Sequence, residues 1–145
     1  MKTVYESLVT WLNEILTDPE NEFPETLTVI DLEQIPNWQE FQNAGLFSSP
    51  NDIQVEYMGG QIRHTEFKSL YLRLSFKEFS ERLRNETFLE KFRRCINKKA
   101  LSGIMPSDGR KWLKINCNGS IYPAHRQENN EYADYLVPLA IEYFS

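Results

Sequence analysis

The candidate catalytic residues in this 145-residue chain are His64, His125, Asp134 and Cys117. A histidine beside a carboxylate could act as a general base, and a cysteine beside a histidine could act as a nucleophile. Such groups must converge in one pocket, yet none of the four stands in a nucleophile elbow, a zinc-binding helix or a paired-acid motif. We therefore interpret them as surface or packing residues and expect no catalytic site.

The two cysteines, Cys95 and Cys117, have neither the spacing of metal ligands nor the density of a disulfide framework. We expect both to be buried free thiols. A Cys/His metal cage would have to recruit every cysteine and both histidines of the chain, so we expect no metal and no cofactor.

Basic residues are concentrated between positions 82 and 114, a stretch that contains ten Lys or Arg and only three acidic residues. A patch of this kind could follow a phosphate backbone, and a DNA-binding module that uses the helix between Lys91 and Lys99 is the alternative function. However, the isoelectric point is about 5.1, and no stacking aromatic residues interleave with the bases on the polar face of the helix, since Phe88 and Phe92 belong to its apolar stripe. We favour a solvated or subunit-contacting face, whose candidate interface residues are Arg93, Arg94 and Lys98.

Charge is divided unevenly along the chain. Residues 1–60 carry eleven acidic residues and one basic residue, whereas residues 61–145 carry ten acidic and fifteen basic residues. If the two halves present different faces, identical copies could meet head to tail, and such contacts close into rings or propagate as filaments. The alternative is that these charges are simply solvated.

Tyrosines cluster in the last third of the chain, and Tyr135 and Tyr143 are further interface candidates, because tyrosine buries a large area and keeps a polar tip. Packing at the edge of the core is the other interpretation.

Hydrophobic spacing predicts two helices, at residues 2–17 and after a proposed N-cap at Asn85. Alternation predicts strands at residues 27–32, 53–57, 62–76, 112–117 and 135–144, with a further strand starting at Ile121. Residues 35–47 are predicted to form a loop, with at most one short helix at residues 38–43. The Asn118-Gly119 pair predicts a two-residue hairpin, and Pro138 predicts an edge position or a bulge.

A second hairpin is predicted around the Gly59-Gly60 turn. Its returning strand would include Ile62 and His64, and the whole hairpin, residues 55–72, could project as an arm. The last strand should tie the C-terminus into the sheet, since chain ends otherwise fray.

Together these elements predict one α+β domain over residues 1–145, with an antiparallel or mixed sheet and two main helices packed on one face. We expect no membrane span and no secretory signal, because no apolar run is long enough and the first residues lack a cleavage site.

The stretches NETFLEKFRRCI and MPSDGRKWLKINCNGSIYPAHRQENNEYADYLVPLAIEYF resemble a family of small bacteriophage and prophage proteins. Members are minor capsid, head-tail joining or tail terminator proteins of long-tailed phages. The features that match are an amphipathic Phe-Leu helix after Asn85, a strand led by Trp112, and an Asp-Tyr pair that opens a final strand ending in Tyr143 and Phe144.

The resemblance implies a tail-terminator-like subunit that forms a ring, with six copies as the expected number, at the head-proximal end of the tail. Such a protein would stop tube polymerisation. Its partners would be itself, the tail tube protein and the head connector, with passive contact to DNA in the lumen. It would assemble in the host bacterial cytoplasm and remain in the virion neck or tail.

Overall fold

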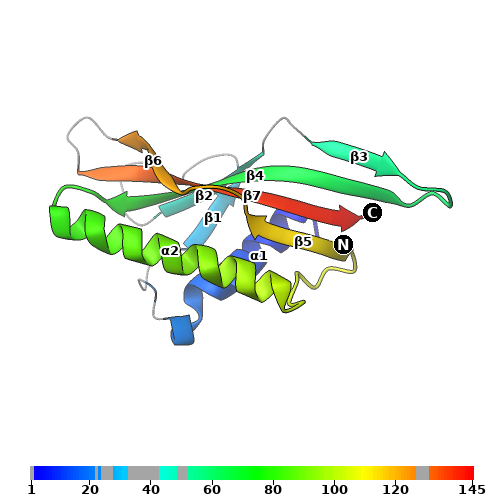
Figure 1. The fold of residues 1–145 in the computed structure, drawn as a ribbon, viewed down its shortest axis with the longest axis horizontal. Helices are drawn as coiled ribbons and strands as arrows, with labels where there is room; N and C mark the ends of the chain where they lie inside the picture. The colour runs from blue at the N-terminus through cyan, green and yellow to red at the C-terminus, as the bar shows by residue number, and fades with distance from the viewer. Residues whose placement is uncertain (1, 22, 24–27, 33–42, 49–51, 127–130) are drawn as a thin grey trace.

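A mixed β-sheet forms one layer of the molecule and two α-helices form a second layer on one of its faces (Figure 1). The structure is a computed structural model that describes residues 2–21, 23, 28–32, 43–48, 52–126 and 131–145. In chain order the elements are α1 (Val4–Thr17), a short 3-10 helix (Pro19–Asn21), β1 (Thr28–Leu32), β2 (Asn43–Ser48), β3 (Ile53–Glu56), β4 (Ile62–Ser75), α2 (Phe79–Leu101), β5 (Lys111–Cys117), β6 (Tyr122–Arg126) and β7 (Tyr132–Phe144). The predicted α+β class, with a mixed sheet and two helices, is confirmed.

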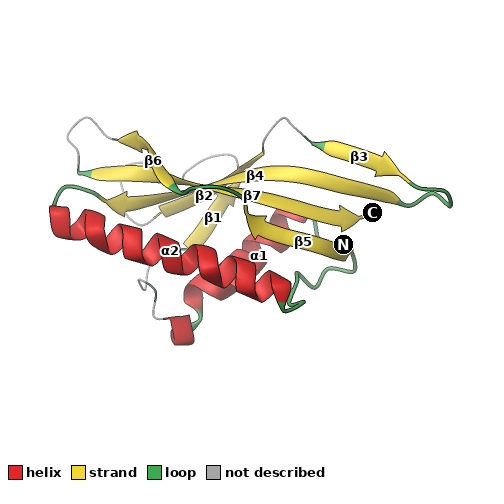
Figure 2. Ribbon diagram, in the orientation of Figure 1, coloured by secondary structure: helices red, strands yellow, loops and turns green. Residues whose placement is uncertain are grey.

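The long strands β4 and β7 form the centre of the sheet, whose order is β1-β2-β4-β7-β5. β3 also pairs with β4, and β6 also pairs with β7. β1 and β2 are parallel, while the other pairs are antiparallel. Figure 2 shows both helices beneath this sheet.

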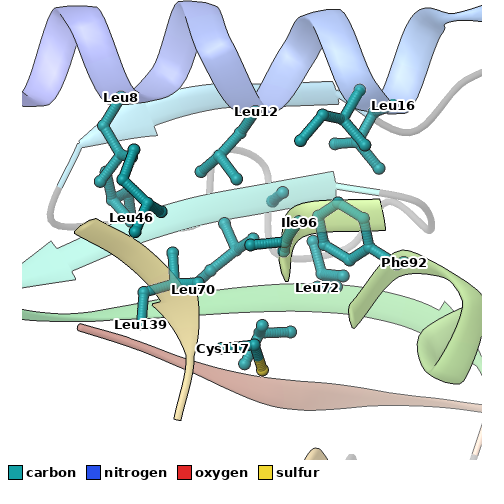
Figure 3. Packing of buried hydrophobic residues seen from close by; sticks show 14 of the residues in the cluster. Leu8, Leu12, Leu16, Leu46, Leu70, Leu72, Phe92, Ile96, Cys117 and Leu139 are labelled. Atoms are coloured by element: carbon teal, nitrogen blue, oxygen red, sulfur yellow. The ribbon is translucent and has the colours of Figure 1, made fainter. Parts of the chain in front are cut away.

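The core lies between the helices and the sheet. The register places Leu70 opposite Val137 and Leu72 opposite Tyr135, so these alternate residues share the face that the helices cover. Figure 3 shows the leucines of α1 pointing toward the strands. The fully or almost fully buried residues of this layer include Leu8, Leu12, Leu46, Leu70, Leu72, Phe92, Ile96 and Leu139.

Helix α1 begins close to its predicted start because Thr3 caps it. The Glu6 amide donates to Thr3 Oγ1 (3.1 Å) and the Thr3 amide donates to Glu6 Oε2 (2.9 Å). This reciprocal pair is a capping box, which satisfies backbone donors that the first turn leaves without helical partners.

Helix α2 begins six residues before the predicted N-cap, so that prediction was wrong. Asn85 lies inside the helix and is buried, and its Nδ2 donates to the Ser75 carbonyl (2.6 Å). The start is fixed instead by Glu81, whose Oε1 accepts from the Glu78 amide (2.9 Å). Arg82 donates to the Phe76 carbonyl (2.8 Å) and so joins the first turn to the end of β4.

Part of the predicted loop at residues 35–47 is a strand, β2. Its pattern covers only six residues and contains Gly45, so the sequence signal is weak. The segment forms a strand because it pairs with β1 on one side and with β4 on the other. Ala44 and Leu46 are fully buried there. The possible helix at residues 38–43 falls mostly outside the described residues.

The predicted Asn118-Gly119 hairpin was also wrong. In the described part of the chain β5 and β6 do not pair with each other, and both lie along the same edge of β7. A bulge also places Trp112 on the same buried face as Ile115 and Cys117, although simple alternation put Trp112 on the opposite face.

Pro138 lies in β7, which is an internal strand rather than an edge. Its carbonyl accepts from the Asn118 amide (2.9 Å) at the junction where the neighbour of β7 changes from β5 to β6. Because the N and C=O of one strand residue point to the same side, the missing N–H of Pro138 points into this junction, where no ladder bond is lost.

Candidate subunit-contact surfaces

Strand β3 and the first part of β4 form a hairpin that projects beyond the helices at one end of the molecule (Figure 1). We call residues 53–65 the arm. At its tip the Tyr57 amide donates to the Gln61 carbonyl (2.8 Å). Gly59 and Gly60 have φ values of 99° and 87°, which glycine adopts without strain. The hairpin predicted around Gly59, Gly60, Ile62 and His64 is confirmed, and its use as a subunit arm remains a prediction.

The arm presents apolar side chains to solvent at both of its ends. Met58 at the tip is fully exposed, and Ile53 at the start of β3 is 54% exposed. Tyr57 packs edge-on against Phe144 with ring centroids 5.9 Å apart, so the base of the turn is attached to β7 while Met58 extends beyond it.

A buried polar cluster anchors the arm to the body. The His64 ring stacks on Tyr143 (4.8 Å between centroids), and the Tyr143 hydroxyl donates to Glu66. Lys68 Nζ lies 2.8 Å from Glu66 Oε1 and 4.6 Å from the centre of the Tyr5 ring of α1. Burial alone would raise the pKa of Glu66, but the bonds from Lys68 and Tyr143 outweigh it and lower that pKa. Burial and the Glu66 carboxylate raise the pKa of Tyr143.

Tyr135 and Tyr143 are therefore not contact residues on the surface, and that prediction was wrong. Tyr135 is 1% exposed and Tyr143 is 6% exposed. Both occupy the same alternating positions of β7 as Val137 and Ile141, which face the helices. The alternative interpretation, packing in the core, is the one that the structure supports.

A second polar cluster joins α1 to the entry of β5. Asp108 Oδ2 accepts from Ser7 Oγ of α1 (2.6 Å) and from Arg110 Nη1 (2.5 Å). Asp108 Oδ1 accepts from Trp112 Nε1 (2.9 Å) and from the Arg110 amide (3.0 Å). Burial alone would raise the pKa of Asp108, but the hydrogen bonds from Ser7, Trp112 and Arg110 outweigh it and lower that pKa to about 2.

The basic residues of α2 have different environments. Lys91 donates to the Asn21 carbonyl (2.5 Å), and Lys99 Nζ lies 3.3 Å from Glu14 Oε2 of α1. In both contacts a basic residue of α2 binds a partner in the acidic half of the same chain, residues 1–60. For these two helices the acidic and basic halves do not present different faces, because α1 and α2 lie on the same face of the sheet (Figure 1).

The three candidate contact residues of α2 remain at the surface to different degrees. Arg94 is exposed and pairs with Glu90 one turn earlier (2.5 Å). Lys98 is exposed, while Arg93 is half-buried near the Cys117 thiol. The exposed ion pair between Arg94 and Glu90 contributes little to stability, so Arg94 could leave it to bind a partner. Lys98 is accessible because its side chain is exposed.

The four residues with catalytic chemistry do not form one site in the described structure. Asp134 is buried in a bidentate ion pair with Arg73 (2.7 and 3.0 Å). Arg73 and His64 lie nine residues apart along β4, a separation of about 30 Å at 3.3 Å per residue. Burial raises the pKa of the Cys117 thiol, although the charge of Arg93 opposes this. Only the backbone of His125 is described, in β6 opposite Asp134.

Both cysteines are free thiols, as predicted, although Cys95 is only half-buried. Among the described residues, no three His, Cys, Asp or Glu side chains gather closely enough to hold a metal ion. Within the same ranges, neither helix has the length and apolar character needed to cross a membrane.

A groove of about 280 Å³ runs between the C-terminal end of α2 and β5. β5 is the last strand in the sheet order, and among the described strands it pairs with β7 alone. The groove is lined mainly by apolar side chains, together with Asn97, Lys114 and Asn116. Its apolar lining consists of Ala100, Leu101, Met105, Leu113 and Ile115.

No protein-family model matches this chain, and a search of the curated proteins found no match.

Sequence reasoning missed the groove and both polar clusters. One signal was available: Glu66 and Lys68 alternate in phase with Leu70 and Leu72, so the period of two places an opposite-charge pair on the buried face. Asp108 gave no such signal, because its partner Ser7 is 101 residues away along the chain.

Proposed function

We propose that this chain is a structural virion assembly protein of a phage or prophage. In this role it is a tail terminator or head-tail joining subunit that forms a ring at the head-proximal end of the tail and stops tube polymerisation. The observation that carries the proposal is the arm, whose fully exposed Met58 extends beyond the body on a hairpin anchored by Glu66, Lys68 and Tyr143.

A second observation supports the same proposal. The sequence features that resemble the phage family lie in α2, β5 and β7, which are adjacent in space: β5 pairs with β7, and the Cys117 amide of β5 donates to Asn97 Oδ1 of α2 (2.8 Å). The resemblance therefore follows one contiguous packing unit rather than scattered positions.

The environment of α2 does not favour the DNA-binding alternative. Lys91 and Lys99 make contacts with the N-terminal segment. Phosphate binding by these residues would have to compete with those contacts.

The test is to add the purified protein to polymerising tail tube protein of the phage or prophage that encodes it and to examine the products by electron microscopy. We expect short tubes with a ring at one end. Tubes of unchanged length, together with binding to duplex DNA that weakens steeply with salt, would replace this proposal with the DNA-binding module. A variant with Arg93→Glu and Arg94→Glu should weaken self-association, and sedimentation of both proteins would measure this.

A further inference from the structure

The connection between β5 and β6 contains the Asn118-Gly119 pair, which forms no hairpin and has no role in the proposed function. β5 ends opposite Leu139 of β7, and β6 starts opposite Leu136. The chain takes five residue steps, from 117 to 122, to join positions that lie three steps apart on β7. A surface connection with this slack can change its backbone angles without moving either strand.

The side chain of Asn118 and the backbone nitrogen of Gly119 are not held by other groups of the described structure. Both residues are exposed. The backbone N–H of Asn118 donates to the Pro138 carbonyl (2.9 Å), but within the described ranges neither the Asn118 side chain nor the Gly119 N–H has a hydrogen-bond partner. Glycine also has no side chain that could shield its own nitrogen. The Asn118 Cγ atom and the Gly119 nitrogen can therefore approach each other.

Asp108-Gly109 is the one other pair in this chain in which Asp or Asn precedes glycine, and its environment is the opposite. The side chain of Asp108 is 1% exposed and accepts hydrogen bonds from Ser7 and Trp112. These bonds lower its pKa to about 2, so the carboxyl group stays ionised at neutral pH. An ionised, buried carboxylate is a poor target for a nucleophile, and the structure therefore protects this pair.

Every other asparagine of the chain is followed by a residue that carries a side chain. Asn85 and Asn97, which lie inside α2, are also held by hydrogen bonds of their side chains. Asn85 Nδ2 donates to the Ser75 carbonyl (2.6 Å), and Asn97 Oδ1 accepts from the Cys117 amide (2.8 Å). Because the helix also fixes the backbone around both residues, their side chains cannot turn toward the next backbone nitrogen.

We propose that Asn118-Gly119 is a site of spontaneous covalent modification, at which the folded chain loses ammonia and its backbone isomerises. Asparagine is among the residues that are chemically labile in proteins. The Gly119 nitrogen attacks Cγ of Asn118, a bond forms between these two atoms, and the bond from Cγ to Nδ2 breaks. Ammonia leaves with the proton of the Gly119 amide, and a succinimide ring remains. This inference goes beyond the proposed function and does not depend on it.

Water then opens the succinimide in one of two ways. Cleavage of the bond between the ring nitrogen and Cγ leaves an ordinary aspartate at position 118. Cleavage of the bond between the nitrogen and the α-carbonyl carbon leaves isoaspartate, in which the main chain passes through Cβ and Cγ. Both products add one negative charge where the neighbour of β7 changes from β5 to β6, and isoaspartate also lengthens the connection by one methylene group.

The experiment incubates the folded full chain at mildly alkaline pH, because the attacking nitrogen must lose its proton, and analyses tryptic peptides by mass spectrometry at intervals. Deamidation raises the mass of the peptide that spans residues 115–126 by the difference between water and ammonia, and fragmentation distinguishes Asn116 from Asn118. Enzymatic methylation of isoaspartyl carboxylates measures the isomerised product. Both signals should grow with time at position 118. The peptide that spans residues 100–110, which contains Asp108, should give no isoaspartate.

Two variants separate the effect of the structure from the effect of the local sequence. Asn118→Gln should lose both signals, because its longer side chain closes a larger ring far more slowly. Asp108→Asn creates a second asparagine before a glycine, but at a buried position. In the folded Asp108→Asn variant, position 108 should stay unmodified during the time in which half of position 118 reacts. In guanidinium chloride, which removes the structure, the two positions should react at similar rates. Circular dichroism checks that both variants are folded before incubation.

A folded wild type that stays unmodified while the chain in guanidinium chloride reacts would overturn the inference, because the fold would then protect this pair. The same products from Asn118→Gln would also overturn it, since they would have to arise at another residue. Equal rates at positions 108 and 118 in the folded Asp108→Asn variant would show that burial gives no protection, which contradicts the structural argument. If that variant proves to be unfolded, the comparison of wild type with and without guanidinium chloride still decides the question.

Discussion

The carboxylate of Asp108 should contribute measurably to stability, because it accepts hydrogen bonds from α1 and from the entry of β5 while its side chain is only 1% exposed. Its pKa falls from 3.8 to about 2 on folding. Since a tenfold change in an acidity constant corresponds to about 1.4 kcal/mol, this fall corresponds to about 2–3 kcal/mol of unfolding free energy at neutral pH.

The perturbation is Asp108→Asn, which keeps the shape of the side chain and removes its charge. At pH 7 we expect the variant to be less stable by about 2–3 kcal/mol. With a urea dependence of about 1–3 kcal/mol per molar, the midpoint of unfolding should fall by roughly 1–3 M. Urea titration followed by circular dichroism and tryptophan fluorescence measures both quantities.

The dependence on pH distinguishes this account from a simple packing defect. A carboxylate whose pKa is lowered in the folded state contributes its full stability above the unfolded value, 3.8, and loses it as the pH falls through about 2. The stability difference between wild type and Asp108→Asn should therefore be constant above about pH 5 and should shrink steadily between pH 4 and pH 2.

A matched control is Glu86→Gln, which removes an exposed carboxylate of α2. It should change the unfolding free energy by less than about 0.5 kcal/mol. A difference between wild type and Asp108→Asn that stays the same from pH 7 to pH 2, or one no larger than that of the control, would refute the reasoning.

Three further predictions concern stability, and chemical denaturation measures each of them. Asp134→Asn leaves the buried Arg73 guanidinium without its charged partner and should lower the unfolding free energy by about 3–5 kcal/mol. The double replacement Arg73→Met with Asp134→Leu should lower it far less, and equal losses would contradict this account. Leu70→Ala should lower the unfolding free energy by about 2–5 kcal/mol, because it leaves a cavity between α1 and the sheet. Leu83→Ala at an exposed position should lower it by less than about 0.5 kcal/mol, and similar values for the two variants would be inconsistent with the described core. Thr3→Ala removes the cap of α1 and should cost about 1 kcal/mol, in contrast to Thr87→Ala on the exposed surface of α2, which should not destabilise.

Long periodic segments were predictable from sequence. The amphipathic spacing of α1 and the alternation of β4 and β7 each extend over many residues, so a chance match to the same period is improbable. The C-terminal strand is tied into the sheet as expected, because the Ser145 amide donates to the Ile62 carbonyl (3.0 Å).

Short or ambiguous segments were not predictable. β2 depends on partners on both sides, and the start of α2 depends on bonds from Arg82 and Asn85 to the end of β4. Asn118-Gly119 has the sequence of a tight hairpin, yet β5 and β6 do not pair with each other. Both pair instead with β7, which is long enough to hold them one after the other along the same edge. Local propensity is a weak preference that such pairing overrides.

The sequence by itself determined which face of each long helix and strand is apolar, because the periods of 3.6 and 2 are properties of the backbone. It also placed an arm around Gly59 and Gly60. Only the tertiary structure decided that Tyr143 belongs to the core, that Ser7 and Asp108 meet, and that α2 and β5 leave a groove between them. These features join residues far apart in the chain, and their pairing depends on how the layers pack rather than on any local pattern.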